Sequence, residues 1–234
     1  MQTLTLKDPD IRSCEELLSV LADPDCRCKG PVYEMFRGLS QTEEDKKWLY
    51  EHQIRYDVTR IPGREICGEW VKTKGHYHPK APDGASYPEI YEVLEGEALY
   101  LLQKQDLLDI ILVTARKGDL VLIPPEYGHI TINPSKETLL MANLVSSAFS
   151  SEYLPFEELQ GAAYYLLSYG RIEKNPRYTG EVAPIRRVDG VGKILPYPFP
   201  KRPLYECIDD AEALAFLNSP ASFGDIYPDL YLFT

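Results

Sequence analysis

The chain has 234 residues, with 25 basic and 36 acidic side chains and a formal net charge of −11. Hydrophobic residues make up 44% and charged residues 26%, proportions typical of a globular protein rather than a disordered one. Because an acidic surface repels phosphate backbones, we expect no nucleic-acid partner. The apolar runs are too short to cross a bilayer, and the first residues show no export signal. We therefore expect a cytoplasmic protein without membrane contact.

The first 53 residues contain three expected elements. Apolar spacing predicts a short helix over Ile11–Leu21, with Ser13 and Glu15/Glu16 as its cap and first turn, and a second helix over Gln41–His52. Between them, Pro31–Phe36 has the composition of a strand.

From Ile54 the apolar period changes to two, and turns rich in glycine and proline divide the sequence into short runs. Eight strands are predicted, over Ile54–Ile61, Glu65–Thr73, Glu89–Leu94, Ala98–Gln103, Leu108–Thr114, Leu120–Ile123, His129–Asn133 and Leu139–Val145. Parallel strands would need helical crossovers, for which the intervening segments are too short. We therefore expect an all-β core that forms an antiparallel, jelly-roll-like sandwich or barrel.

After Phe149 the composition changes again. The pattern predicts a helix over Phe156–Leu167, a segment rich in Pro, Tyr and Arg over Asn175–Pro203, and an amphipathic helix over Asp209–Asn218. These flanks carry too few elements for a second core. We predict one domain over residues 1–234, with its core at about 54–150, an N-terminal segment over 1–53 and a C-terminal extension over 151–234.

The cysteines give no sign of a metal site or a disulfide framework. They are five in number, and Cys26 and Cys28 are separated by one residue, which is closer than the usual spacing of zinc ligands. We expect all of them to be reduced thiols without a chemical role. The five are Cys14, Cys26, Cys28, Cys67 and Cys207.

Three of the four histidines fall in two suggestive places. His76 and His78 lie in TKGHYHP, and side chains two residues apart on a strand point to one face. Glu89 begins the next predicted strand, and His129 follows much later in IPPEYGHITIN. We predict that these four residues hold one divalent ion per chain, whereas His52 lies outside both motifs. Imidazole and carboxylate ligands suit Fe, Mn, Ni, Cu or Zn and do not choose among them.

These residues resemble the two motifs of the cupin superfamily. The first motif corresponds to His76, His78, Glu89 and Gly96, with a longer loop before the glutamate than most cupins have. The second corresponds to Gly118, Pro124, His129 and Asn133, whereas Glu126 occupies the place of its second glycine. The resemblance implies a cupin fold, a small antiparallel β-barrel with the metal inside.

A narrower resemblance extends from about Pro31 to about Asn143. TKGHYHP, EIYEVLEGEALYLLQ and GDLVLIPPEYGHITIN look like the cupin-type glucose-6-phosphate isomerases best known from archaea, as do PVYEMF and VTRIPGREICGEW upstream. This implies a metal-dependent aldose–ketose isomerase that interconverts glucose 6-phosphate and fructose 6-phosphate in glycolysis and gluconeogenesis. Among the divalent ions, iron is the first expectation, with Zn, Mn or Ni as alternatives. The expected partners are a sugar phosphate and a second copy of the chain in a homodimer.

The resemblance also implies how the substrate is held. Its phosphate would lie against hydroxyl groups and a backbone amide of the matching strands. These belong to Tyr33, Thr59, Thr73, Gly75 and Tyr91. None of the five is a lysine or arginine, so we expect neutral donors to bind the phosphate.

The chemistry is assigned to Glu89 and His76. Isomerisation proceeds either by proton transfer through an enediol or by a hydride shift, and the sequence does not choose between them. Glu89 is the one carboxylate that the motifs place at the metal, and it is therefore the candidate base. Family members carry a tyrosine and then a histidine after the second motif. Here Leu144 stands at the expected tyrosine, no histidine follows, and Tyr153 is the candidate substitute.

Two other functions stay open. A cupin dioxygenase would use the same metal ligands but needs an apolar pocket, whereas Thr59, Thr73 and Tyr91 predict a polar one. A non-catalytic protein that binds a sugar phosphate is favoured by the missing tyrosine and histidine. The C-terminal extension either closes a dimer or covers the mouth of the barrel.

Overall fold

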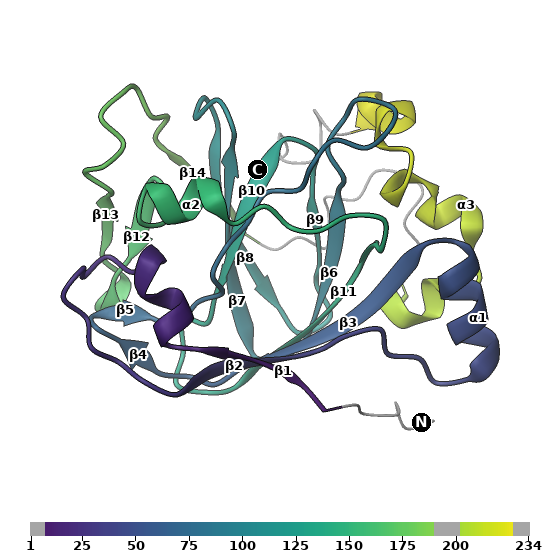
Figure 1. The fold of residues 1–234 in the computed structure, drawn as a ribbon, viewed down its shortest axis with the longest axis horizontal. Coiled ribbons are helices and arrows are strands. Elements are labelled where there is room, and N and C mark those ends of the chain that lie inside the picture. Colours follow the sequence, from purple (N-terminus) through teal and green to yellow (C-terminus); the bar gives the residue numbers. More distant parts are fainter. Residues whose placement is uncertain (1–7, 190–201, 227–234) are drawn as a thin grey trace.

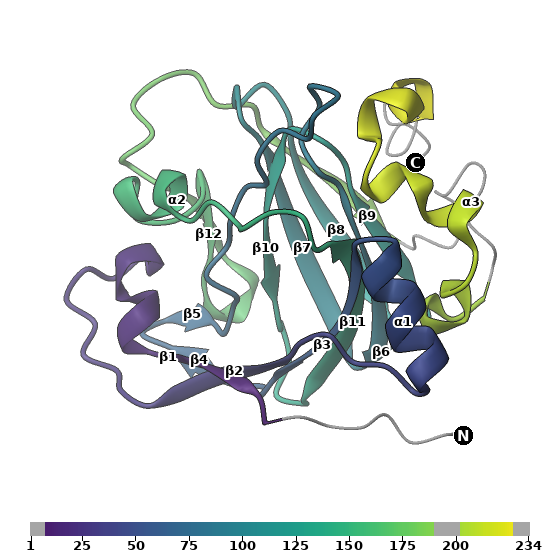
Figure 2. The same cartoon turned by 45° about the vertical axis from the view of Figure 1, so that its right-hand side comes forward.

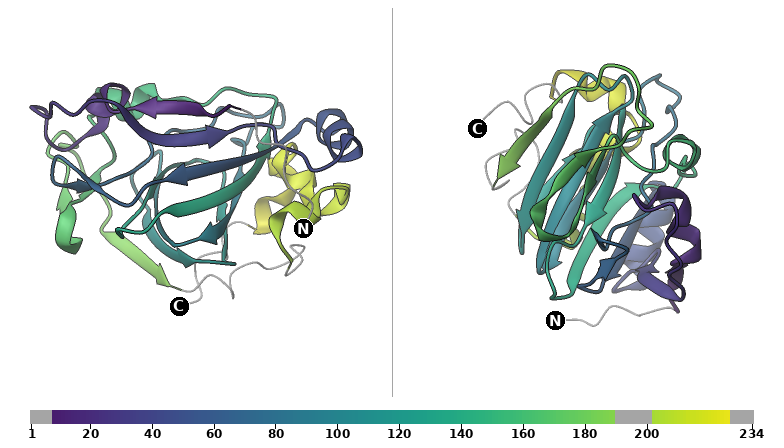
Figure 3. Two further views of the ribbon diagram at one scale, coloured as in Figure 1. Left: turned by 90° about the horizontal axis from the view of Figure 1, so that it is seen from below. Right: turned by 90° about the vertical axis from the view of Figure 1, so that its left-hand side faces the viewer.

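Two β-sheets face each other and form the barrel of the protein (Figure 1). The computed structural model describes residues 8–189 and 202–226. One sheet has the order β1 (Asp10–Ser13), β2 (Pro31–Phe36), β3 (Ile54–Ile61), β11 (Leu139–Ser146), β6 (Glu89–Glu95) and β9 (Leu120–Ile123). The other has the order β10 (Tyr127–Ile132), β7 (Glu97–Lys104), β8 (Ile110–Arg116) and β14 (Ile185–Asp189). Figure 3 shows from below how β1 and β2 continue the sheet beyond β3.

The predicted fold class is confirmed. Strand pairs within the two sheets are antiparallel, with the one exception of β14 beside β8, which is parallel. The barrel core is made of apolar side chains from both sheets. In β8, for example, Ile110–Val113 are at most 2% exposed, so both faces of the strand are covered.

Most predicted strands lie within two residues of the observed ones, but the strand predicted over Glu65–Thr73 is wrong. It is a short hairpin of β4 (Glu65–Ile66) and β5 (Glu69–Trp70). The two residues between them, Cys67 and Gly68, have φ of 48° and 84°. Two successive residues in the left-handed region form the tight turn that reverses an antiparallel pair.

The N-terminal helix predicted over Ile11–Leu21 is also wrong in its first half. Ile11 belongs to β1, and a 3-10 helix, η1 (Glu15–Val20), follows. Ser13 Oγ accepts from the Glu16 amide at 3.4 Å and the Ser13 amide donates to Glu16 Oε2 at 2.8 Å, whereas Cys14, directly before the helix, provides no side-chain cap. The second helix is confirmed as α1 (Glu43–Glu51), with a capping box between Thr42 and Asp45.

The helix predicted over Phe156–Leu167 ends much earlier. It is α2 (Leu154–Glu158), and Gln160 and Gly161 then take φ of 55° and 109°. A left-handed residue followed by glycine ends a helix. The chain continues as a hairpin of β12 (Tyr164–Leu166) and β13 (Ile172–Lys174), with η2 (Ser168–Gly170) between them.

The C-terminal segment packs beside α1 on the outside of the six-stranded sheet (Figures 1 and 2). It comprises η4 (Leu204–Cys207), α3 (Ala211–Leu214), η5 (Ala215–Leu217) and η6 (Pro220–Ile226). The Leu204 amide donates to Glu92 at 2.7 Å, and the Tyr205 hydroxyl to Asp45 at 2.8 Å. The predicted helix over Asp209–Asn218 is therefore present as α3 and η5. Residues 190–201 of the segment predicted over Asn175–Pro203 lie outside the described residues.

Four of the five cysteines form disulfides, so the expectation of reduced thiols is wrong for them. Cys14 is joined to Cys28 and Cys26 to Cys67, whereas Cys207 is buried and free. The Cα atoms of the pairs lie 5.7 and 5.8 Å apart, within the range that a disulfide spans. Cys26 and Cys67 are 41 residues apart in the chain, and only the position of the β4–β5 turn brings them together.

Within the described ranges, 8–189 and 202–226, none of the helices has the length and apolar character needed to cross a bilayer.

Candidate active site

A cavity of about 280 Å³ opens inside the barrel, and all the residues predicted for the site line it. One wall is formed by β3, on which Arg55, Asp57 and Thr59 alternate with buried residues and therefore face one side. β11 lies beside β3 and β6 beside β11. The cavity wall is thus a continuous, mostly polar surface across three strands.

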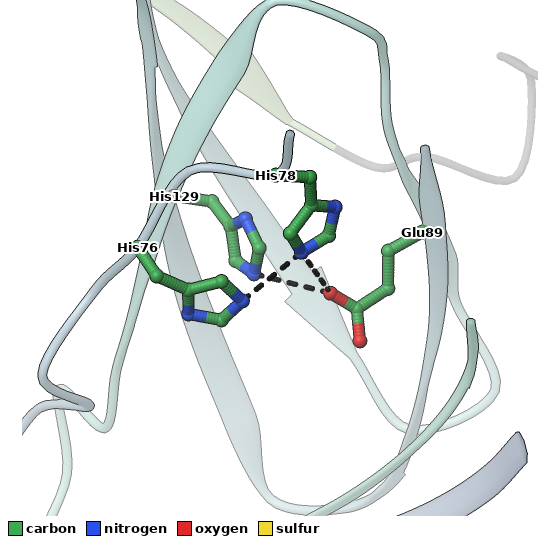
Figure 4. A group of neighbouring side chains, drawn as sticks. All are labelled: His76, His78, Glu89 and His129. Carbon is green, nitrogen blue, oxygen red and sulfur yellow. Dashed lines mark hydrogen bonds and ion pairs between the residues drawn. The ribbon is translucent and has the colours of Figure 1, made fainter. Parts of the chain in front are cut away.

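The candidate metal ligands converge at one point of this cavity (Figure 4). Glu89 begins β6 and His129 lies on β10, in the opposite sheet. His76 and His78 come from the segment before β6; this segment is not a full strand, but His76 and His129 bridge through two backbone hydrogen bonds. The Nε2 atoms of His76 and His78 are 3.0 Å apart, and Glu89 Oε2 lies 3.4 Å from His78 Nε2 and 3.3 Å from His129 Nε2.

The hydrogen bonds of His78 indicate why a cation fits here. Its Nδ1 lies 2.8 Å from the Tyr87 carbonyl oxygen, which assigns the proton to Nδ1 and leaves a lone pair on Nε2. That lone pair faces the Glu89 carboxylate, so two acceptors point at one space. The donor atoms of all four residues lie within 4.8 Å of one another. Three imidazoles and a carboxylate fit a divalent ion such as Fe, Mn, Ni, Cu or Zn.

Burial keeps the histidines ready to bind a metal. Desolvation, with a smaller contribution from the neighbouring imidazoles, lowers the pKa of His76 well below its usual value. Desolvation also lowers the pKa of His78 to about 4. Burial would raise the pKa of Glu89, but its contacts with His129 and His78 outweigh that effect and lower it. At neutral pH His76 and His78 are therefore neutral and Glu89 is ionised, the forms that bind metals.

The residues predicted to hold the substrate surround this cluster. The Thr73 hydroxyl oxygen accepts from the Thr131 amide at 2.9 Å, which leaves its hydrogen free to donate. The Gly75 amide donates to no protein acceptor among the described residues, and its φ of 78° suits glycine. The Tyr33 hydroxyl accepts from the Lys74 amide at 3.2 Å. The structure brings them together with Thr59 and Tyr91 in one cavity.

Sequence reasoning missed two arginines in the same cavity. Arg37 and Arg55 both contact the buried carboxylate of Asp57. The cavity therefore contains cationic donors as well as the neutral ones expected. The period of two along β3 was the available signal, because Arg55 and Asp57 must face the same side as Thr59.

The segment after the second motif differs from the expected arrangement. Leu144 is fully buried and does not line the cavity, whereas its neighbours Asn143 and Val145 do. Tyr153 reaches the cavity, and its ring lies 5.5 Å from that of His76. The role of Tyr153 as a substitute stays a prediction.

The sequence is similar to those of curated glucose-6-phosphate isomerases. A curated glucose-6-phosphate isomerase of Thermococcus onnurineus is 28% identical over 150 residues, which are 63% of this chain and 72% of that protein. The glucose-6-phosphate isomerase of Pyrococcus furiosus is 26% identical over 149 residues, with the same coverage of 63% and 72%.

Solved structures similar to the barrel include two kinds of oxalate-converting enzyme. An oxalate oxidase in complex with glycolate is 19% identical, with a TM-score of 0.35 over 44% of this chain and 47% of that one. An oxalate decarboxylase of Bacillus subtilis is 15% identical, with a TM-score of 0.39 over 52% and 28% of the two chains.

The family model described as glucose-6-phosphate isomerase matches residues 11–182. This range contains both histidine motifs, every predicted substrate-binding residue and the two arginines of the cavity. It also extends beyond the second motif, through the segment that carries Tyr153. Because the match covers well over half of the sequence, the chain belongs to the glucose-6-phosphate isomerase family.

Proposed function

We propose that the protein is a metal-dependent isomerase that interconverts glucose 6-phosphate and fructose 6-phosphate, and that it serves glycolysis and gluconeogenesis. The observation that carries this proposal is the meeting of the two predicted groups in one cavity: the metal-ligand cluster, and the hydroxyl and amide donors around Thr73 and Gly75. The polar lining supports a sugar phosphate over the apolar substrate of a dioxygenase.

The isomerisation moves one hydrogen from C2 to C1 and one proton between the two oxygens, with no net change in composition. A divalent ion, with Fe as our first choice and Zn, Mn or Ni as alternatives, would be held by His76, His78, Glu89 and His129 and would polarise the sugar oxygens as a Lewis acid. The same proposal includes a homodimer as the working form.

The residues of the chain have separate roles in this proposal. The Thr73 hydroxyl and the Gly75 amide bind the phosphate, with Thr59 and Tyr33 beside them. Glu89 takes the proton from C2 and returns it to C1. Glu89 Oε2 faces the imidazoles of His78 and His129, so the proposed base belongs to the ligand cluster whose ion would polarise the sugar oxygens. His76 and Tyr153, whose rings are neighbours, lie at the reacting end, where Tyr153 opens the sugar ring by proton transfer.

The test is a coupled assay of fructose 6-phosphate conversion with the purified protein. We expect turnover that is lost on treatment with a chelator and restored by one divalent ion per chain, measured by elemental analysis. His129→Gln should lose both metal and turnover. The matched control is His52→Gln, because His52 stacks on Trp48 at a ring distance of 4.0 Å and lies outside the cavity.

Two results would contradict the proposal. Tight binding of fructose 6-phosphate by a metal-loaded protein without turnover would indicate a non-catalytic binding protein. Oxygen consumption with an organic substrate and none with the sugar phosphate would indicate a dioxygenase.

A further inference from the structure

Arg55 lies at the end of the cavity where the metal ligands converge. In the strand register, Val145 of β11 pairs with Arg55 of β3 on one side and with Glu89 of β6 on the other. Arg55 is thus two strand spacings, about 10 Å, from Glu89 between Cα atoms, a gap that an arginine side chain can reach across. Thr59 lies four residues further along β3, about 13 Å from Arg55. Arg55 therefore belongs to the metal end of the cavity, and Thr59 to the predicted phosphate end.

The guanidinium of Arg55 is held in place by a buried carboxylate. Its Nε lies 2.9 Å from Oδ1 and 2.8 Å from Oδ2 of Asp57. Asp57 is only 2% exposed, and it also accepts from the Gly38 amide at 2.8 Å and from Arg37 Nη1 at 3.3 Å. A carboxylate with this many donors is a rigid support.

Arg37 and Arg55 differ in how many of their guanidinium nitrogens remain available to a ligand. The nitrogens of Arg37 are engaged with Asp57, with Asp10 and with the sulfur of Met35. Within residues 8–189 and 202–226, the terminal nitrogens of Arg55, Nη1 and Nη2, donate to no protein acceptor. Val145, the residue between Arg55 and Glu89, is apolar and does not compete for them. Arg55 lines the cavity, so these two donors are available to a ligand bound there.

We propose, on the basis of the isomerase function above, that Arg55 is a catalytic residue whose Nη1 and Nη2 contact the oxygens at the reacting end of the sugar. Either route of isomerisation places negative charge on O1 or O2. In the enediol route the C2–H electron pair forms the C1–C2 double bond, the proton leaves to the base, and the carbonyl electron pair moves to O1. Arg55 transfers no proton, because a guanidinium does not deprotonate in proteins, and it stabilises that charge.

A specificity follows from this role. The site favours sugar phosphates whose first carbon carries an anionic group over those whose first carbon is a neutral alcohol. Gluconate 6-phosphate and glucitol 6-phosphate form a matched pair of probes, since they share the carbon chain and the phosphate and differ only at C1. Their binding can be measured by calorimetry without any turnover, so the result is independent of whether the protein isomerises its substrate.

We expect Arg55→Met to weaken the binding of gluconate 6-phosphate tenfold or more. A hydrogen bond to a charged group contributes about 1.5 kcal/mol or more, and about 1.4 kcal/mol corresponds to a tenfold change in Kd. The Kd of glucitol 6-phosphate should change less than about twofold. The matched control is Arg60→Met. Arg60 lies on the opposite side of β3, does not line the cavity, and pairs through its Nε with Glu34 at 2.7 Å. This variant should bind both ligands with unchanged Kd.

The outcomes separate the alternatives. An equal loss of affinity for both probes would place Arg55 at the shared phosphate and overturn the proposal. An unchanged affinity for both probes would also overturn it. If Arg55→Met does not fold, Arg55→Lys decides: its single ammonium stays with Asp57, and the tenfold or larger weakening of gluconate 6-phosphate binding should still be seen. For turnover, Arg55→Ala should lower kcat more than it raises KM, and added guanidinium ion should restore part of kcat. A wild-type protein without isomerase activity that keeps the preference would refute the proposed function and the catalytic role, but not the contact between Arg55 and the first carbon of the sugar.

Discussion

Glu126 occupies the place of the second glycine in the cupin pattern, and its backbone explains what the glycine does there. Its φ is 70°, in the left-handed region that costs a residue with a Cβ roughly 1–2 kcal/mol. The side chain offsets part of this cost, because Glu126 Oε1 accepts from the Ser86 amide at 3.3 Å and the Glu126 amide donates to the Ser86 hydroxyl. The departure from the motif therefore keeps the turn that leads to His129.

Thr73 offers a prediction at the same scale. Thr73→Val keeps the β-branched shape but removes the hydroxyl that would donate to the phosphate, so we expect KM for fructose 6-phosphate to rise about ten- to a hundredfold with the metal still bound. The lost contact with the Thr131 amide should also lower the melting temperature slightly. Steady-state kinetics measure KM, elemental analysis measures the bound metal, and thermal unfolding measures the melting temperature. An unchanged KM would place the phosphate elsewhere.

Glu89→Gln separates the two roles of this carboxylate. Glutamine keeps one acceptor oxygen but cannot act as a base, so we expect turnover to fall about a hundredfold or more while part of the metal is retained. Metal content and turnover are measured on the same preparation. Near-normal turnover in the metal-loaded variant would remove Glu89 from the chemistry.

Among the elements, the disulfides fasten the N-terminal segment to the β4–β5 turn. The loop closed by Cys26 and Cys67 spans 41 residues, and such a cross-link contributes on the order of 4 kcal/mol through the unfolded chain. We expect Cys26→Ala to lower the melting temperature by roughly 10 °C. Denatured, unreduced protein should titrate one thiol per chain, that of Cys207. Five titratable thiols would contradict the pairing.

The packing of η4 on the sheet predicts a dependence on pH. Burial raises the pKa of Glu92, the Leu204 amide lowers it in part, and Glu206 raises it further. Because the pKa of Glu92 is raised in the folded state, its ionisation lowers the free energy of unfolding. This loss is absent below the unfolded pKa of about 4.3 and grows as the pH rises through the folded pKa. Glu92→Gln keeps an acceptor for Leu204, so we expect a melting temperature about 2 °C or more above the parent at pH 8 and equal to it at pH 4.

The control for that variant is Glu95→Gln, an exposed carboxylate on the same strand. It should match the parent at both pH values. A lower melting temperature of Glu92→Gln at pH 8 would indicate that the ionised carboxylate stabilises η4.

The predictability of an element depends on how local its causes are. The ranges of β2, β3 and β9 agree with prediction residue by residue, because alternation and flanking turn residues define them. The β4–β5 hairpin and the early end of α2 depend on single left-handed residues, Cys67 and Gln160, which composition does not reveal. The disulfides were missed because their partners meet only in the folded chain.

For the whole molecule, a resident metal is a folding ligand as well as a catalyst. An ion that binds only the folded state at a hundred times its Kd adds about 2.7 kcal/mol to the free energy of unfolding. We expect chelation to lower the melting temperature by about 5–10 °C and added metal to restore it. His78→Gln should abolish this dependence. Equal melting curves with and without chelator would contradict a metal centre formed by the four ligands.

The candidate site could be predicted from the sequence only where its residues follow a local pattern. His76, His78, Glu89 and His129 are recognisable because a metal requires particular residue types at particular spacings. Arg37 and Arg55 have no such pattern, and arginines on a chain of this charge are usually interpreted as surface residues. The alternation along β3 places Arg55 on the same face as Thr59, and the registers of β3, β11 and β6 add that this face meets the ligand cluster.

β14 has a consequence for solubility that concerns neither the cavity nor its chemistry. Ile185 pairs with Ile110 and Val188 with Val113, so β14 occupies the edge of β8 that β7 leaves open. An uncovered edge of a β-sheet presents a row of free amides and carbonyls on which other chains can assemble. In β8 that edge borders a run of apolar residues, the composition that favours aggregation. Cleavage of the chain between β13 and β14 would release this cover, and the truncated protein would then tend to aggregate through β8.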